Sequence, residues 1–209
     1  MSRGRFISLE GGEGAGKSTQ AKRLAEALAA RGIETLVTRE PGGSEGAEAI
    51  RALLMQGEVT RWSPHGEALL FAAARADHVE KRISPALGAG LWVICDRFID
   101  SSRAYQGRAG GIDDAAIMAL HGFGSRGLLP DRTFVLEVPH DEGAARATGR
   151  DGAAADRFAA RGEGFHRDVA DAFRRFAAAE PERIRLIDAT GTPEAVTERL
   201  LAGLADLLP

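Results

Sequence analysis

Short apolar runs alternate with longer amphipathic stretches along the chain. The apolar runs predict strands at 5–10, 33–39, 91–96, 133–138 and 184–188. The stretches around them have helical periodicity and cover 17–30, 44–57, 64–88, 98–125, 140–179 and 193–207. Because parallel strands need long crossover connections, this alternation predicts an α/β fold with one five-stranded parallel sheet and helices on both faces.

Glycine and proline mark several of the expected boundaries. Gly32 follows the first helical stretch, and Gly88 and Gly90 close the third, where a left-handed residue can end a helix. Pro85 falls inside the third stretch, where it lacks an N–H and clashes with the preceding turn. We therefore expect a kink or a break near residue 84.

Composition narrows the class of protein. The 209 residues and the hydrophobic content of 44% fit one globular domain over 1–209. No run approaches the roughly 18 apolar residues of a membrane helix, and the first apolar run is too short for an export signal, so we expect no membrane partner and a cytoplasmic location. The net charge of −3 argues against binding polymeric nucleic acid. Cys95 is the only cysteine, which excludes an internal disulfide.

The segment after the first strand carries the most specific motif. Its glycines let backbone N–H groups converge on phosphate oxygens at a helix N-terminus. Lys17 can reach the β and γ phosphates, and the Ser18 hydroxyl can coordinate Mg²⁺. The flanking strand and helix argue against the alternative, a glycine-rich turn without a ligand. The residues that fit G-x-x-x-x-G-K-[ST], followed by Thr19, are predicted to bind ATP: Gly11, Gly12, Glu13, Gly14, Ala15, Gly16, Lys17 and Ser18.

This motif alone does not define a kinase, because switches and motor ATPases also carry it. Four segments together resemble the bacterial thymidylate kinases. They are the glycine-rich loop 11–18 with Glu13, the run Thr38–Gly43, Asp96–Phe98 with Ser101 and 104–107, and Ile187–Thr190. The resemblance implies a P-loop NTPase fold and transfer of the γ-phosphate of ATP to dTMP, forming dTDP for dTTP synthesis. It also implies Mg²⁺ as cofactor and a homodimer.

Two arginines are candidates for holding the acceptor phosphate. Guanidinium groups bind a doubly charged phosphate without reacting with it. Arg97 follows the carboxyl end of a strand, where ligands bind in open α/β sheets, and Arg51 lies on the helix after Pro41–Gly43. A solvated surface arginine is the alternative, and it is stronger for Arg51. Asp96 ends the same strand and can hold Mg²⁺, or it can cap a helix.

The base-binding residues are suggested by spacing and by the resemblance. Phe71 and Arg75 are four residues apart and so share one helix face. By resemblance Phe71 stacks on thymine and Arg75 donates to a carbonyl oxygen of the base, although spacing alone makes Phe71 a core residue more often. The resemblance assigns the remaining contacts with dTMP to Glu13 near the 3′-hydroxyl, Tyr105 beneath the deoxyribose, Ser101 and Gln106 near the base, and Glu40 and Pro41.

Catalysis by such a site needs cations and positioning more than a base, because a phosphate nucleophile is already ionised. We expect Lys17 and Arg97 to serve here. Gly14 stands where some relatives have an arginine, so a further cation must come from elsewhere. Residues 149–164, rich in Gly, Ala, Arg and Asp, predict a short flexible lid. We expect Arg150, helped by Arg157 or by Arg146, which is also a candidate for ATP binding, to close over the phosphate; a solvated loop would carry similar charges.

Two other functions remain open from the sequence. A kinase for another nucleotide or small metabolite would keep the phosphate-binding loop and would use the positions of Phe71, Arg75 and Tyr105 to recognise a different acceptor. A regulatory P-loop switch would need no acceptor, and it would leave the set of Arg51, Arg97 and Tyr105 unexplained.

Overall fold

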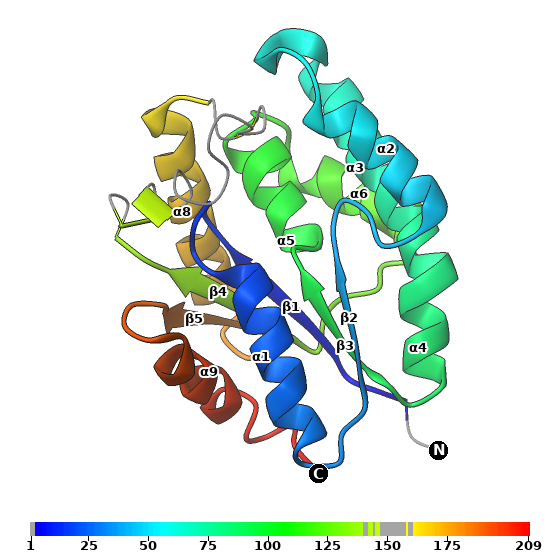
Figure 1. The fold of residues 1–209 in the computed structure, drawn as a ribbon. Coiled ribbons are helices and arrows are strands. Elements are labelled where there is room, and N and C mark those ends of the chain that lie inside the picture. Colours follow the sequence, from blue (N-terminus) through cyan, green and yellow to red (C-terminus); the bar gives the residue numbers. More distant parts are fainter. Residues whose placement is uncertain (1–2, 140–141, 144, 147–157, 159–160) are drawn as a thin grey trace.

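The computed structural model describes residues 3–139, 142–143, 145–146, 158 and 161–209, and in these residues helices pack around a five-stranded sheet (Figure 1). The strands are β1 (Phe6–Gly11), β2 (Thr35–Arg39), β3 (Trp92–Asp96), β4 (Arg132–Glu137) and β5 (Ile184–Asp188). Their order is β2-β3-β1-β4-β5, and every neighbouring pair is parallel. The prediction of a five-stranded parallel sheet is therefore confirmed, with strand ends within about two residues of those expected.

Helices cover both faces of this sheet, as predicted. None of those described is long and apolar enough to cross a membrane. The helical elements are α1 (Lys17–Ala29), α2 (Glu45–Met55), η1 (Val59–Arg61), α3 (Pro64–His78), η2 (Val79–Ile83), α4 (Ser84–Gly88), α5 (Ile99–Ser102), η3 (Arg103–Arg108), α6 (Asp114–Ser125), α8 (Glu163–Ala179) and α9 (Pro193–Ala202).

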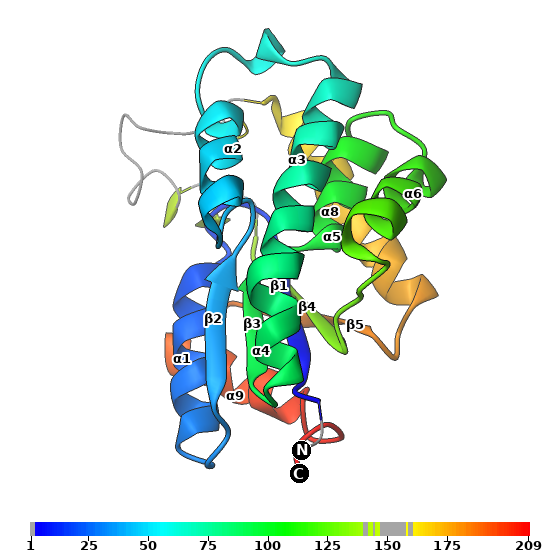
Figure 2. The same ribbon diagram turned by 90° about the vertical axis from the view of Figure 1, so that its right-hand side faces the viewer.

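Alternate residues of the central strands point to opposite faces of the sheet and pack into separate core layers. In β1, Ile7 and Leu9 pack with α1 and α9, whereas Phe6 packs with α3, α4, α5 and α6. Val135 of β4 belongs to a third cluster, beneath α8 on the same side as Phe6. Figure 2 shows this layering, with the edge strand β2 between α1 and α4. All six residues of β1 are buried because both of its faces are covered.

Pro85 changes the helix without breaking it. The stretch 64–88 continues through the π turn η2, which directly precedes the turn that carries Pro85. A wider turn accommodates a residue that cannot donate to the helix ladder. Gly90 follows this continuous helical segment in the left-handed conformation, at φ 88°, as expected. Gly88 is the last residue of α4, so its assignment as a cap was wrong.

The stretch 98–125 is less regular than its periodicity suggests. It comprises α5, the π turn η3, a loop at 109–113 and α6, which Asp113 caps by accepting from the Ala115 N–H at 3.3 Å. The π turn is important for the site, because it carries Tyr105 and Gln106. Of the predicted lid at 149–164, only Phe158 and residues 161–164 are among the described residues.

Candidate active site

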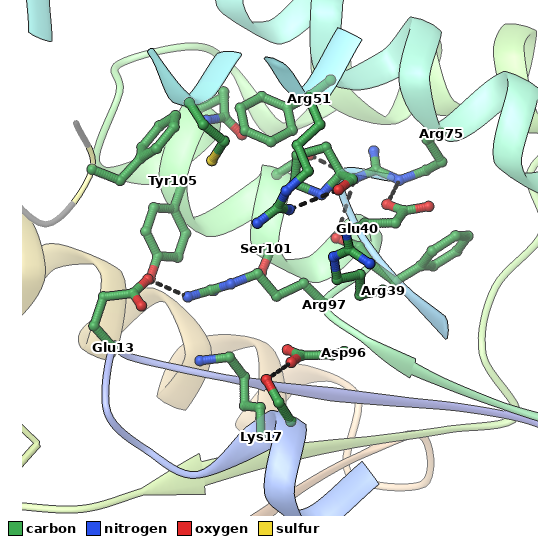
Figure 3. A pocket seen from close by; sticks show the side chains of 18 of the residues that line it. Glu13, Lys17, Arg39, Glu40, Arg51, Arg75, Asp96, Arg97, Ser101 and Tyr105 are labelled. Atoms are coloured by element: carbon green, nitrogen blue, oxygen red, sulfur yellow. Dashed lines mark hydrogen bonds and ion pairs between the residues drawn. The ribbon is translucent and has the colours of Figure 1, made fainter. Parts of the chain in front are cut away.

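A cavity of about 510 Å³ opens where β1, β2 and β3 end. Its position follows the rule that ligands of open α/β sheets bind beyond the carboxyl ends of the strands. Its volume suits a small ligand. Figure 3 shows side chains from the β1–α1 loop, the β2–α2 loop, α2, α3 and the segment after β3 around this space.

The loop between β1 and α1 forms the phosphate cradle. Gly11, Gly14 and Gly16 have φ values of 130°, 71° and 89°, a region that favours glycine. A Cβ on Gly11 would also lie 2.5 Å from the Leu136 carbonyl oxygen. Gly16 is the N-cap of α1 and makes no side-chain cap hydrogen bond, so the first N–H groups of α1 are directed at whatever anion occupies the loop.

Lys17 lies folded against this loop. Its Nζ donates to the Gly12 carbonyl oxygen at 2.7 Å and to that of Gly11 at 3.2 Å. Burial, followed by repulsion from Arg97, lowers the pKa of Lys17 to about 8. A bound polyphosphate would favour the charged form of Lys17, because an opposite charge nearby counteracts both effects.

Ser18 and Asp96 form the predicted magnesium pair. The Ser18 hydroxyl donates to Asp96 Oδ2 at 2.5 Å, so two oxygen atoms that can bind a metal lie together at the start of α1 and the end of β3. Among the described residues, no group of three His, Cys, Asp or Glu side chains forms a metal site. The Ser18–Asp96 pair nevertheless fits Mg²⁺, which is commonly bound by one or two protein oxygens together with substrate phosphates and water.

Arg97 adopts an uncommon backbone conformation that its neighbours stabilise. Its φ is 69°, which is rare for a residue with a side chain. Its N–H donates to the Leu9 carbonyl oxygen at 2.9 Å, and the Cys95 thiol donates to its carbonyl oxygen at 3.0 Å. The guanidinium donates to Glu13 at 2.5 Å and to Ser101 at 3.1 Å.

Arg97 keeps its positive charge although its side chain is partly buried. Burial opposes the cation, but the neighbours Tyr105, Glu13, Asp96 and Glu10 outweigh it and raise the pKa of Arg97. The guanidinium carbon also lies 5.0 Å from the centre of the Tyr105 ring, a favourable cation–π arrangement. A permanent cation therefore lies between the cradle and the rest of the cavity.

Glu10 hydrogen-bonds the segment that follows Arg97, and it was not assigned from the sequence. Its carboxyl accepts from the Phe98 N–H at 2.8 Å and from the Ser101 hydroxyl at 2.5 Å. Burial, followed by repulsion from Asp100, raises the pKa of Glu10 to about 8. An acidic residue inside an otherwise apolar strand is the signal that could have identified it.

Arg51 and Arg75 reach the cavity from α2 and α3. The Arg51 guanidinium donates to the Pro41 carbonyl oxygen at 2.7 Å. Arg75 is 3% exposed and donates to Glu40 Oε2 at 2.7 Å and to the Ser102 hydroxyl at 2.9 Å. Glu40 therefore directs its carboxylate toward Arg75.

The opposite wall of the cavity is aromatic. The rings of Phe71 and Phe158 meet edge to face with centroids 5.7 Å apart, and Tyr105 approaches Phe158 at 6.5 Å. The Tyr105 hydroxyl is buried, and none of the described residues forms a hydrogen bond with it. A buried hydroxyl is costly to leave unpaired, so a polar group of a ligand is the natural partner.

The cavity brings together most of the side chains predicted to bind ATP, Mg²⁺ or dTMP. Its lining does not include Gly11, Gly12 or Ala15 of the loop. It does not include Arg146 either, which donates to the Ala189 carbonyl oxygen at 3.4 Å and pairs with Glu142. Arg150 and Arg157 lie outside the described residues. The predicted residues that line it are Glu13, Gly14, Gly16, Lys17, Ser18, Thr19, Glu40, Pro41, Arg51, Phe71, Arg75, Asp96, Arg97, Ser101, Tyr105 and Gln106.

Several lining residues were not assigned from the sequence. Arg39 lies inside the Thr38–Gly43 run and Ser102 directly follows Ser101, so both had a local signal. Met55, Phe98 and Phe158 also line the cavity, and as apolar residues they could not be told from core residues by pattern.

The strand–loop–helix cradle, the Ser18–Asp96 pair and the adjoining basic cavity define the class of protein. This is an enzyme with the P-loop NTPase fold and room for a second, anionic ligand beside the nucleotide phosphates.

Comparison with known proteins identifies the family. The family model for thymidylate kinase matches residues 9–200. A thymidylate kinase of Rhizorhabdus wittichii is 62% identical over 206 residues, with 99% of each chain covered. One of Afipia carboxidovorans is 53% identical over 199 residues, covering 95% of this chain and 87% of the relative. The crystal structure of thymidylate kinase from Ehrlichia chaffeensis has a TM-score of 0.79 at 32% identity, covering 97% and 99% of the two chains. The chain belongs to the thymidylate kinase family.

Proposed function

We propose that this member of the thymidylate kinase family phosphorylates dTMP to dTDP, in dTTP synthesis, with ATP on the loop 11–18 and dTMP in the adjoining cavity. The observation that carries this arrangement is the position of Arg97, a partly buried cation between the phosphate loop and the aromatic wall. An arginine there can contact the acceptor phosphate while Lys17 contacts the phosphate being transferred.

On the donor side, backbone N–H groups of the loop and Lys17 would hold the ATP phosphates. Lys17 would leave the carbonyl oxygens of Gly11 and Gly12 for the β and γ phosphates. Ser18 and Asp96 would hold Mg²⁺, which when bound neutralises phosphate charge and helps to align the reacting groups. Arg146, which lies near Ala189, is also proposed to contact ATP.

On the acceptor side, Arg51 and Arg97 would bind the phosphate of dTMP. Arg97 is already charged and held by Glu13 and Ser101, so little reorganisation is needed when the phosphate arrives. Glu13 would then lie near the sugar 3′-hydroxyl, and the unpaired Tyr105 hydroxyl would gain a polar partner at the deoxyribose.

The thymine base would lie against Phe71, with Arg75 donating to one of its carbonyl oxygens. Glu40 is proposed to act through Arg75, because its carboxylate fixes the Nε side of that guanidinium at 2.7 Å. Pro41, Ser101 and Gln106 would complete the walls. Arg150 and Arg157 are proposed to supply further positive charge to the transferring phosphate, a role that single substitutions by glutamine would test through kcat.

An acceptor panel tests the assignment. ADP formation would be measured with dTMP, dUMP, dCMP and dGMP at matched concentrations. We expect dTMP to have the highest kcat/KM, with dUMP about 10–200-fold lower because it lacks one methyl group, and dCMP lower still. Preference for dCMP or dGMP would overturn the assignment, and ATP turnover that ignores dTMP would indicate a switch protein.

We also propose that the enzyme is a cytoplasmic homodimer. The dimer is implied by the family resemblance, and Phe123 on α6, a residue that is 94% exposed, is our candidate for a contact with the second copy. Light scattering of the purified protein should give twice the chain mass, and Phe123→Ser should shift it toward the monomer. An unchanged mass in that variant would place the interface elsewhere, and a monomeric wild-type protein would refute the dimer.

A further inference from the structure

Glu67 is a buried acid that neither the sequence nor the proposed reaction assigns. It lies in the first turn of α3 and is 2% exposed. Gln106 Nε2 donates to Glu67 Oε1 at 2.9 Å. Arg161 Nη2 donates to Oε1 at 3.1 Å and to Oε2 at 2.9 Å. One carboxylate thus joins a residue that lines the cavity to a residue at the start of the α8 region.

We infer that Glu67 is a positioning residue for base selection, because it fixes which end of the Gln106 amide faces the cavity. This inference rests on the proposed location of dTMP. A carboxylate paired with arginine can only accept hydrogen bonds, so the amide nitrogen of Gln106 must face Glu67. The amide oxygen of Gln106 is then the end available to a ligand in the cavity.

The orientation of this amide distinguishes pyrimidine bases. Thymine has a donor N–H at ring position 3, whereas cytosine has an acceptor nitrogen there. An amide oxygen therefore pairs with thymine and opposes cytosine. To bind cytosine, Gln106 would have to rotate its amide and give up a hydrogen bond to a buried carboxylate, which is among the more costly bonds to lose.

Arg161 places its guanidinium opposite the Glu67 carboxylate, 2.9 Å from Oε2. Its guanidinium carbon lies 5.1 Å from the centre of the Phe158 ring and 4.4 Å from that of Phe165. Phe158 in turn packs against Phe71 and Tyr105. Glu67 therefore sits between the base-binding wall and the aromatic cluster that holds Arg161.

A plain structural ion pair is the alternative. In that case Glu67 would only tie α3 to the segment before α8, and its loss would weaken folding without favouring one acceptor over another. The two accounts differ in the ratio of kcat/KM for dTMP to that for dCMP, which a purely structural role leaves unchanged.

The test compares Glu67→Gln with Glu80→Gln, an exposed glutamate on the same helical rod that serves as the matched control. A glutamine at 67 can either accept from Gln106 or donate to it, so both amide orientations become available. We expect the preference for dTMP over dCMP to fall at least about tenfold, mainly through a lower KM for dCMP, with the KM for ATP unchanged. The control should retain the wild-type ratio.

A second variant separates selection from folding. Glu67→Gln combined with Arg161→Met removes both charges while keeping an apolar stem between the two rings, and it should recover part of any lost thermal stability. We expect its base preference to remain reduced. If either folded variant keeps the wild-type ratio, the inference is wrong. A wild-type enzyme that does not prefer dTMP would instead refute the proposed acceptor.

Discussion

The proposed donor and acceptor halves of the cavity are built in different ways. The donor half is one contiguous loop, 11–18, whose glycines and backbone N–H groups form the binding surface. The acceptor half is made of side chains from the β2–α2 loop, α2, α3, β3 and η3 (Figure 3). A site made of backbone groups can be recognised from one short sequence motif, whereas a site made of side chains from distant segments forms only when the chain folds.

The two halves also differ in how their cations are held. Lys17 rests on carbonyl oxygens of its own loop, while Arg97 pairs with Glu13 and Arg75 with Glu40. Removing Arg97 or Arg75 takes an ion pair away from a carboxylate, which costs folding stability as well as function. Removing Lys17 takes away a buried charge that its surroundings disfavour.

Replacement of Lys17 should produce the largest loss of activity. In Lys17→Met we expect kcat to fall by about 10³-fold, because a cation at the transferring phosphate is lost. Thermal stability should be equal to or higher than that of the wild type, since a partly desolvated ammonium group has been removed. Measured kcat and Tm would check both. A large drop in Tm would contradict the inference that the surroundings of Lys17 disfavour its charge.

Replacement of Arg97 should harm both activity and folding. We expect Arg97→Gln to lower kcat by about 10²-fold and to lower Tm, because the ion pair between Arg97 and Glu13 is lost. Adding Glu13→Gln should recover part of the Tm and none of the kcat. Full recovery of kcat in the double variant would mean that Arg97 only neutralises Glu13.

Arg75→Lys should affect substrate binding more than turnover. A lysine cannot bond Glu40 and Ser102 with a planar fork, so the base would lose a positioned donor. We expect the KM for dTMP to rise about tenfold with little change in kcat. Steady-state kinetics at saturating ATP would measure this, and an unchanged KM would remove Arg75 from the acceptor site.

The smallest effect concerns Glu10 and the pH dependence of stability. Its pKa is raised from 4.5 to about 8 in the folded chain, so folding takes up a proton between these values. The stability contributed by the protonated carboxyl is therefore lost as pH rises from about 5 to 8. Glu10→Gln should flatten the fall in Tm over this range relative to the wild type. Parallel Tm curves for the two proteins would show that Glu10 does not titrate there.

Much of this architecture was predictable from local patterns. The parallel sheet followed from the alternation of apolar runs and helical stretches, and the cradle followed from one motif between 11 and 18. The placement of Arg51, Phe71 and Arg75 around one cavity needed the resemblance, because helical spacing alone does not distinguish a pocket residue from a core residue.

The remainder depends on contacts between residues distant in sequence. Glu10 reaches the Phe98 N–H across 88 positions, and Glu67 receives Arg161 across 94. The π turn that presents Tyr105 and Gln106 follows from hydrogen-bond shifts that hydrophobic periodicity does not encode. Such features arise from tertiary packing and were not visible in the linear pattern.

The central claim is that two phosphates meet between Lys17 and Arg97. A crystal structure with dTMP and a non-hydrolysable ATP analogue tests it most directly. We predict the dTMP phosphate at Arg51 and Arg97, thymine against Phe71, and the triphosphate on the loop 11–18. A dTMP molecule bound elsewhere, with Arg97 still bonded only to Gly11, Glu13 and Ser101, would contradict the account.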